Sequence, residues 1–281
     1  MILRKCAIYL ITFFLLISCG KKSDSTSESI VVGVSIFPVY DIAYNIAGGR
    51  AELFFLIPVG ANPHSYEPSP SIVKKLQEVT LYIGVLSDFD GWVEKFIPGN
   101  ATIRYLGDEN KANPHLWLSV KGAKRIAKKI AKFLSDIDQR NADYYMKNLR
   151  NYLAVLNRTD AQIADLFSEI RVKKFIQWHP AWDYLARDYG LAIAGTIQSG
   201  HGDEPSVKQF HRIVEVARRE GITVVVIGLK LQSSAAEGLV REIGGKLVRL
   251  DSIGDPKRSD RSTYASLMLH NARVLSASLK E

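Results

Sequence analysis

Cysteine is scarce in this 281-residue sequence, and its two cysteines, Cys6 and Cys19, both lie near the N-terminus. The remainder of the chain therefore has no thiol from which to build a disulfide bond or a cysteine-ligated zinc site. After the N-terminal segment, no apolar run is long enough to span a membrane. The sequence also lacks the His-Glu-x-x-His and His-x-His-x-Asp patterns of common metallohydrolases, so its histidines do not indicate an enzyme of that kind.

The N-terminal segment has the features of a secretory signal peptide. Arg4 and Lys5 form a short basic region, and residues 7–17 form an apolar stretch without a charge. A stretch of this length is too short to cross a bilayer but suits the apolar region of a signal peptide. We therefore expect residues 1–18 to be a signal peptide, which would also remove Cys6 from the mature chain.

The end of this segment predicts a lipid anchor. Cys19 directly follows a small residue in the sequence LISCG, which resembles a bacterial lipobox. In that case the thiol of Cys19 carries a diacylglycerol and becomes the mature N-terminus, and a plain signal peptide with an incidental cysteine is the alternative. The polar, low-complexity run KKSDSTSES that follows is typical of a flexible linker, so we expect residues 19–30 to form a lipidated tether.

The charge of the chain gives little indication of a polyanionic partner. Removing residues 1–18 lowers the formal net charge from +8 to +6, because two basic residues and no acidic residue are lost. The remaining basic residues are spread along predicted helices such as 121–132, where a solvated face explains them. We therefore do not expect a nucleic acid as a partner of this secreted chain.

Strand and helix patterns alternate in the first part of the chain, as in a parallel sheet. The buried run IVVGVSI begins this part, and a Ser-Pro-Ser sequence supplies the start signal of a later helix. The expected strands cover residues 30–36, 51–58, 81–86 and 103–106, and the expected helices cover about 40–47, 71–78 and 92–96.

The middle of the chain has a helical pattern. Residues 120–170 contain no proline and one glycine, Gly122, and apolar residues recur there at steps of three and four. One helix is expected to end near residues 136–138, and a second to run from residue 141 or 142 to about Phe167. At 1.5 Å per residue the second would be about 40 Å long, which favours a rigid connector over a member of a helix bundle.

The strand and helix alternation then resumes. The expected strands cover residues 174–178, 191–195, 223–227 and 246–250, and the expected helices cover about 182–189, 207–220, 234–243 and 262–279. We therefore predict an α/β fold with two doubly wound lobes of mostly parallel sheets joined by one long rigid helix. The N-terminal lobe would cover residues 31–140, the linking helix 141–170 and the C-terminal lobe 171–281.

Three of the six histidines occur in similar surroundings. His64 and His115 each complete an Asn-Pro-His tripeptide, and His179 lies between Trp178 and Pro180. Each follows an apolar run that predicts a strand, so each should lie at the carboxyl end of a strand, where open α/β sheets bind ligands. Asp251 has the same position after the last strand. Imidazoles that meet in one crevice indicate a transition-metal site.

Each of these residues also has a simpler structural explanation. A lone histidine is more often a packed or surface residue than a ligand, and Asp251 could cap the loop before the last helix. His201 lies in a glycine-rich loop and is expected to be a surface residue, although contact with incoming metal or with a permease is the alternative. His211 and His270 fall on predicted helices and are expected to be structural or exposed.

Several segments occur together in a recognisable order: IPVGANPHSYEP (57–68), NPHLWLS (113–119), HPAWDY (179–184), EPS (204–206) and LDSIG (250–254), followed by Tyr264, Leu267, Met268 and Asn271. In this order they resemble the zinc and manganese solute-binding lipoproteins of metal-importing ABC transporters (the cluster A-I binding proteins). The likeness runs from about residue 30 to the end. Two departures are evident: family members usually carry Asp where this chain has Asn113, and no histidine occurs between Asp88 and Asn113, where many zinc-binding members have a His-rich loop.

The resemblance implies a metal site between the lobes with the ligands His64, His115, His179 and Asp251, two from each lobe. Manganese-specific members often carry Glu at the position of His179. Three imidazoles and one carboxylate suit zinc better than the harder manganese, so we expect zinc, with manganese or iron as alternatives. The aromatic residues near the histidines are expected to wall the site and exclude water; they are Tyr66, Trp117, Trp178 and Trp182.

The resemblance also implies a function. We expect an extracytoplasmic lipoprotein, attached to the membrane by its lipid alone, that delivers a divalent transition metal to an ABC transporter permease and its ATPase. We expect a monomer and no enzymatic activity, because four protein ligands around zinc leave no open position for an activated water. A surface adhesin is the main alternative, although the sequence shows no repeat or low-complexity stalk that would favour adhesion.

Overall fold

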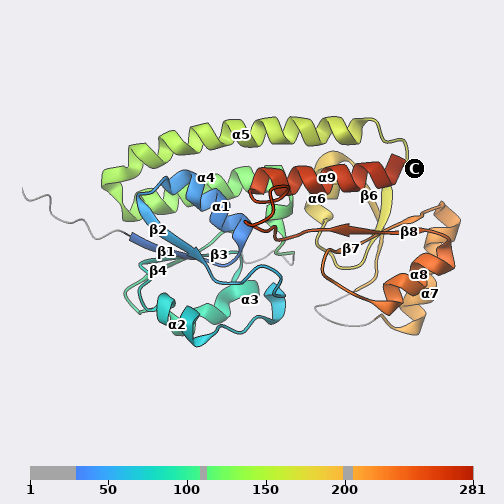
Figure 1. Ribbon diagram of the computed structural model, residues 1–281, viewed down its shortest axis with the longest axis horizontal. Coiled ribbons are helices and arrows are strands. Elements are labelled where there is room, and N and C mark those ends of the chain that lie inside the picture. The colour runs from blue at the N-terminus through green and yellow to red at the C-terminus, as the bar shows by residue number, and fades with distance from the viewer. Residues whose placement is uncertain (1–29, 108–112, 199–204, 281) are drawn as a thin grey trace, which may run out of the picture.

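The computed structural model describes residues 30–107, 113–198 and 205–280. Figure 1 shows two α/β lobes that lie side by side beneath one long helix. The predicted signal peptide, the predicted lipidation site Cys19 and His201 all lie outside the described residues. Within the described ranges, no helix combines the length and the apolar character that crossing a membrane requires.

The N-terminal lobe is built on a four-stranded parallel sheet with the order β2-β1-β3-β4. The inner strands β1 and β3 are mostly buried, which explains why their sequences are almost continuously apolar. The strands are β1 (Ile30–Val34), β2 (Ala51–Phe55), β3 (Leu81–Gly84) and β4 (Thr102–Tyr105). The helical segments that join them are α1 (Phe37–Ala47), η1 (Pro63–Ser65), α2 (Pro70–Leu76), α3 (Ser87–Asp90) and η2 (Gly91–Phe96).

The C-terminal lobe repeats this arrangement, with four parallel strands in the order β6-β5-β7-β8. The strands are β5 (Lys174–Gln177), β6 (Ala192–Thr196), β7 (Val224–Gly228) and β8 (Lys246–Leu250). The helices are α6 (Asp183–Tyr189), α7 (Val207–Glu220), α8 (Ser234–Ile243) and α9 (Tyr264–Lys280). In each sheet the strand that comes first in the chain, β1 or β5, is an inner strand with a neighbour on both sides. In doubly wound folds, this order leaves a crevice at the carboxyl ends of the strands, where ligands bind.

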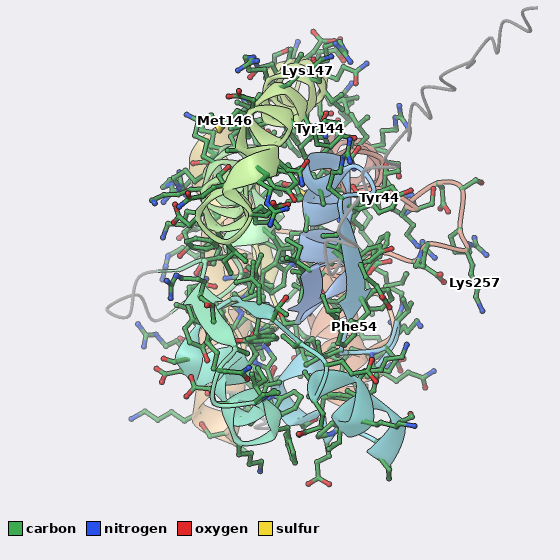
Figure 2. The ribbon with its side chains drawn as sticks, turned by 90° about the vertical axis from the view of Figure 1, so that its left-hand side faces the viewer. Tyr44, Phe54, Tyr144, Met146, Lys147 and Lys257 are labelled. Carbon is green, nitrogen blue, oxygen red and sulfur yellow. The ribbon has the colours of Figure 1, made fainter. Side chains whose placement is uncertain are left out.

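One long helix, α5, joins the lobes, and α4 precedes it in the chain and packs against it. After the short turn η3 (Leu116–Leu118), α4 covers Val120–Ile137; the turn η4 (Gln139–Asn141) then leads into α5, the 27 residues Ala142–Ser168. Figure 1 shows α5 crossing the whole molecule, and it packs against α1 and α4 on one lobe and α9 on the other. Figure 2 shows the N-lobe end of this contact, where Tyr144 of α5 lies near Tyr44 of α1. The predicted fold class, including the long connecting helix, is confirmed.

The hydrophobic core runs from one lobe into the other. The larger cluster includes Val32 of β1, Leu156 of α5 and Val226 of β7, all nearly or fully buried. A smaller cluster covers the other face of the C-terminal sheet and includes Val225 and Ile227. The alternation of neighbouring β7 residues between the two clusters follows from the two-residue period of a strand. The continuous core gives the joint between the lobes a packed apolar interior rather than a flexible linker.

Most element boundaries agree with the sequence to within two residues, and the larger differences concern β2, α1 and two short helices. Helix α1 begins at Phe37 rather than near residue 40, and the short helix α3 was not predicted. β2 ends at Phe55 rather than residue 58, although Leu56 and Ile57 remain buried and their amides still donate to the carbonyls of Val34 and Ser35. The expected helix at residues 92–96 is a 3-10 helix instead. The sequence stays apolar beyond the end of β2 because the loop that follows the strand is also buried, and this made the predicted strand too long.

Candidate metal centre

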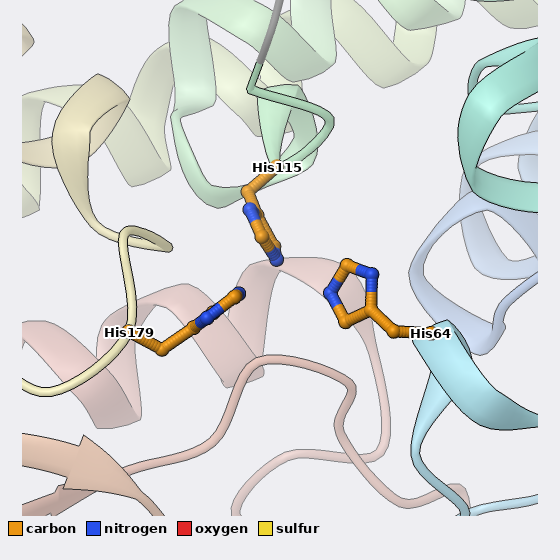
Figure 3. A group of neighbouring side chains, drawn as sticks. All are labelled: His64, His115 and His179. Carbon is orange, nitrogen blue, oxygen red and sulfur yellow. The ribbon is translucent and has the colours of Figure 1, made fainter. Parts of the chain in front are cut away.

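The three predicted histidine ligands meet between the lobes. Each offers a ring nitrogen, and these atoms lie within 4.8 Å of one another. Figure 3 shows the three rings pointing toward one another from separate parts of the chain, with ring centroids 5.0 to 5.4 Å apart. His115 is buried, while His64 and His179 are half-buried. Nitrogens bound to one tetrahedral zinc lie roughly 3.3 Å apart, so a contraction of about 1.5 Å at most would bring them into place.

The shared Asn-Pro-His tripeptide makes the same hydrogen bond at both of its positions. Oδ1 of Asn62 accepts a hydrogen bond from the amide of His64 at 3.0 Å, and Oδ1 of Asn113 accepts one from the amide of His115 at the same distance. At Asn62 this contact caps the 3-10 turn η1, whereas the second tripeptide lies just before the turn η3. The tripeptide therefore fixes the backbone that presents each imidazole.

Asn113 also orients the ring of His115. Its Nδ2 donates to the carbonyl of Pro180 and to Oδ2 of Asp183, both at 2.8 Å, which identifies the other side-chain atom as the oxygen. That oxygen lies 2.8 Å from Nδ1 of His115 and can only accept, so Nδ1 carries the proton. Nε2 of His115 is then left with the lone pair that a metal requires. The sequence singled out Asn113 only as a departure from the family pattern, and its Asn-Pro-His context was the only signal of this role.

A buried amide holds the loop that carries His179. Gln177 is 1% exposed, and its Nε2 donates to Oδ1 of Asp183 at 2.7 Å and to Oγ1 of Thr196 at 3.0 Å. Its Oε1 accepts from the amide of Trp182 at 3.1 Å. Sequence reasoning missed Gln177, which gave no signal of its own at the end of the short strand KFIQ. The loop is thus attached to the sheet on both sides of His179.

The segment between His115 and α4 is also closely packed. Nε1 of Trp117 donates to the carbonyl of Ser252 at 2.7 Å, and the hydroxyl of Tyr264 donates to the carbonyl of Trp117 at 2.8 Å. A Cβ at Gly122 would lie 1.9 Å from the carbonyl oxygen of Leu116, so only glycine lets the first turn of α4 approach this segment. The single glycine of the helical region thus allows the His115 segment to lie on α4.

Asp251 lies in the same cavity but outside the group of side chains whose ligand atoms lie within 4.8 Å of one another. Its Oδ1 accepts from the amides of Ile253 and Gly254, both at 3.0 Å, so it does cap its own loop. Its Oδ2 lies 3.0 Å from Nε of Arg261. The structure therefore brings three of the four predicted ligands together and leaves the fourth within the same cavity, paired with a cation.

The cavity has a volume of roughly 330 Å³ and a largely apolar wall. Trp117 and Trp182 line it as expected, together with Phe89. The ring centroids of Phe89 and His64 lie 5.0 Å apart, with the rings edge to face. Two other aromatic residues have different surroundings from those expected. Tyr66 packs against Trp92, and Trp178 lies in the smaller hydrophobic cluster.

The two remaining described histidines do not line the cavity. His270 Nδ1 lies 3.3 Å from Oδ2 of Asp260, and His211 packs beside Phe210 on α7. Both lie on helices, as the sequence indicated.

A buried acid lies next to Phe89 at the end of α3. Oδ2 of Asp90 accepts hydrogen bonds from the amide of Val85 at 2.8 Å and from the hydroxyl of Tyr82 at 3.1 Å. Burial raises the pKa of Asp90 to about 6, against the lowering effect of these donors. Asp90 therefore holds the end of β3 and the short helix from which Phe89 reaches His64.

Two parallel-sheet lobes joined by a long helix, with three histidines gathered in the crevice between them, are the architecture of a two-lobed solute-binding protein. Residues 32–278 match the model of the family described as zinc-uptake complex component A, periplasmic. The chain belongs to that family, which supplies the solute-binding component of metal-uptake systems and does not consist of enzymes.

Relatives over nearly the whole chain include proteins named for two metals. The zinc uptake protein ZnuA of Bacillus subtilis is 26% identical, with 95% of this chain and 94% of the relative covered. The manganese-binding lipoprotein PsaA of Streptococcus pneumoniae is also 26% identical, with 96% and 97% covered. A crystal structure of ZnuA superposes with a TM-score of 0.79 at 28% identity and covers 90% of this chain and 100% of that one. The relatives thus support the metal-uptake role and leave the choice between zinc and manganese open.

Proposed function

We propose that this protein captures zinc between its lobes, through His64, His115, His179 and Asp251, and delivers it to an ABC transporter for import. The observation that carries the proposal is the meeting of three imidazoles in one cavity of the described residues. Imidazole favours zinc over manganese, for which carboxylate and carbonyl oxygens are the better ligands. Manganese capture is the alternative within the same role, and the relative named for manganese supports it.

The site is suited to capture and release rather than to catalysis. Three imidazoles and one oxygen ligand would complete a tetrahedron around zinc and leave no open position for an activated water. The apolar wall supports this role, because it limits the access of water to the bound ion. The relation to an uptake system implies a permease and an ATPase as partners.

We propose that the protein acts as a monomer outside the cytoplasm, attached through a lipid on Cys19. The lipobox-like sequence before Cys19 supports the anchor. Mass spectrometry of the membrane-extracted protein tests it: a diacylglycerol on an N-terminal Cys19 is expected. An N-terminus at any other residue, or an unmodified Cys19, would contradict the anchor without affecting the metal site.

Metal content is the decisive test. The soluble form that begins at Lys21, purified without an affinity tag, is expected to contain about one zinc per chain, as one tetrahedral site requires. A variant with both His64→Ala and His179→Ala should lose the metal while keeping its fold. Competitive titration with manganese decides the cargo: a preference for manganese would retain the transport role and reject zinc. Equal metal content in the two proteins would reject the ligand assignment and favour adhesion as a role.

Metal binding is also expected to depend on pH. An imidazole must be deprotonated to bind a metal, so zinc affinity should fall as the pH drops below about 6.5. Isothermal titration between pH 8 and pH 5 measures this, with proton release expected to grow as the pH falls. A constant affinity over this range would contradict a site built from three imidazoles.

A further inference from the structure

A buried arginine lies beside the one carboxylate of the proposed ligand set. Arg261 precedes α9, and its Nε lies 3.0 Å from Oδ2 of Asp251, the residue after β8. The two side chains are 13% and 14% exposed, and both line the cavity that the three histidines share. The carboxylate that would receive the metal is therefore already next to a cation.

Both oxygens of Asp251 are engaged. Oδ1 accepts from two backbone amides, those of Ile253 and Gly254, and Oδ2 faces Arg261. A metal that takes Oδ2 has to displace the guanidinium. A metal that chelates both oxygens has to displace it and also break two backbone hydrogen bonds, so chelation costs more than binding through one oxygen.

Arg261 has a second carboxylate within reach. Its Nη1 lies 3.6 Å from Oδ2 of Asp260, which is 40% exposed. Its Nε is buried and makes no hydrogen bond within the described residues, so the contact with Asp251 is an ion pair without a directed hydrogen bond. The guanidinium can therefore move from Asp251 toward Asp260 and keep a carboxylate partner when a metal arrives.

We propose that Arg261 is a specificity-determining residue, which competes with the incoming metal for Asp251 and disfavours ions that need carboxylate oxygens. Zinc with three imidazoles needs only one further ligand. Manganese prefers more oxygen ligands and so depends more on Asp251. The charge of Arg261 also offsets that of Asp251, which weakens the attraction for a hard cation. The inference rests on the proposed function, because it assumes that the three histidines bind the metal.

Paired titrations of zinc and manganese test this proposal. In Arg261→Gln, which removes the charge, manganese affinity is expected to rise by about tenfold and zinc affinity by less than about threefold. Arg261→Lys keeps the charge and should stay close to the original protein. Arg258→Gln is the matched control, because Arg258 is 59% exposed and faces Asp260 rather than Asp251. Figure 2 shows the loop of Arg258 projecting from the body at Lys257.

A second measurement separates specificity from a structural role. The absorption spectrum of bound cobalt reports coordination, and it should indicate more ligands in Arg261→Gln than in the original protein or in Arg258→Gln. An unchanged ratio of zinc to manganese affinity in a folded Arg261→Gln variant would overturn the inference, as would equal losses for both metals. The proposed function fails separately, if His64→Ala, His179→Ala leaves the zinc affinity of the original protein unchanged.

Discussion

The two Asn-Pro-His tripeptides share one hydrogen bond, from the histidine amide to the asparagine side chain, but are attached to the rest of the molecule in different ways. Asn113 donates to Pro180 and Asp183 of the C-terminal lobe, and the hydroxyl of Tyr184 donates back to its carbonyl. Asn62 makes a local contact with the amide of His64. In the chain, His115 thus belongs to the N-terminal part, before α4 and α5. In space, however, the hydrogen bonds of the neighbouring Asn113 connect it to the C-terminal lobe.

This difference divides the site into two unequal parts. His115 and His179 belong to loops that hydrogen-bond to each other through Asn113, so their separation is fixed by direct contacts between the loops. His64 comes from a loop after β2, and its ring packs against Phe89 of the N-terminal lobe. We infer that a relative movement of the lobes changes the distance from His64 to the pair more than the distance within the pair.

Replacing the two asparagines separately tests the comparison most directly. Asn113→Ala removes the acceptor that fixes the His115 ring and the donors that join the two loops. Zinc affinity should therefore fall by about 10- to 100-fold, as for other residues that orient a ligand. Asn62→Ala removes one backbone contact and should cost less than about threefold. Equal losses in the two variants, measured by competition with a chromophoric chelator, would contradict the proposed difference.

Asn113→Asp sharpens the same comparison, because it changes the charge of the side chain and keeps its shape. The oxygen that faces Nδ1 of His115 is kept, but the donor to Pro180 and Asp183 is lost and a second carboxylate is placed next to Asp183. Zinc affinity should fall by about tenfold in a low-salt titration, because the like charges separate the loops. An affinity equal to that of the original protein would show that orientation of the ring alone matters.

The buried amide under the C-terminal half of the site provides the next test. Gln177→Leu leaves Asp183, Thr196 and the amide of Trp182 each without one hydrogen bond. The free energy of unfolding should fall by about 3 kcal/mol, because unmade hydrogen bonds of buried groups are costly. Gln209→Leu is the control: it loses a single donor, to the carbonyl of Ile197, and should cost about 1 kcal/mol. Urea unfolding measures both, and equal costs would show that Gln177 is not a support of the site.

Local signals predicted the elements better than the contacts between them. Helix α7 was predicted to the residue, because Ser206 caps its start and Gly221 ends it with a φ of +64°. The expected helix at residues 234–243 also agrees with α8, which Ser233 caps and Gly244 ends. The positions of His64 and His115 after strands also followed from local patterns, together with the family resemblance.

The remaining contacts had no local signal. Asn113 and Asp183 are 70 residues apart, and no spacing or propensity links them. The pairing of Arg261 with Asp251 likewise depends on how the loop before α9 folds back onto β8. Only the packing of the two lobes brings Asn113 to Asp183 and places Arg261 beside Asp251 in the cavity. Prediction from the sequence therefore reached the three histidines that meet in the cavity and missed the contacts that Asn113 and Arg261 make around them.

The buried acid on the N-terminal side of the site is expected to have the smallest effect on zinc affinity, and it contrasts with Gln177. The pKa of Asp90 is raised from 3.8 to about 6 by burial, so the folded state disfavours the ionised form. The stability that depends on this group is therefore greatest below pH 4, falls as the pH rises from 4 to 6, and stays constant above that. Asp90→Asn keeps an oxygen that accepts from the amide of Val85, but its side chain does not ionise. The variant should therefore not lose stability as the pH rises from 4 to 6.

Asp90→Asn should accordingly be more stable than the original protein by about 3 kcal/mol at pH 8, with the difference shrinking toward zero at pH 4. Thermal unfolding across this range measures it, with Asp88→Asn, an exposed neighbour on α3, as the control. Because the change is isosteric and Phe89 stays in place, zinc affinity should remain within about twofold. A gain in stability that is the same at pH 4 and pH 8 would show that ionisation of Asp90 is not its cause. A large loss of zinc affinity would instead show that the support under His64 matters to binding as much as the contacts that fix His115.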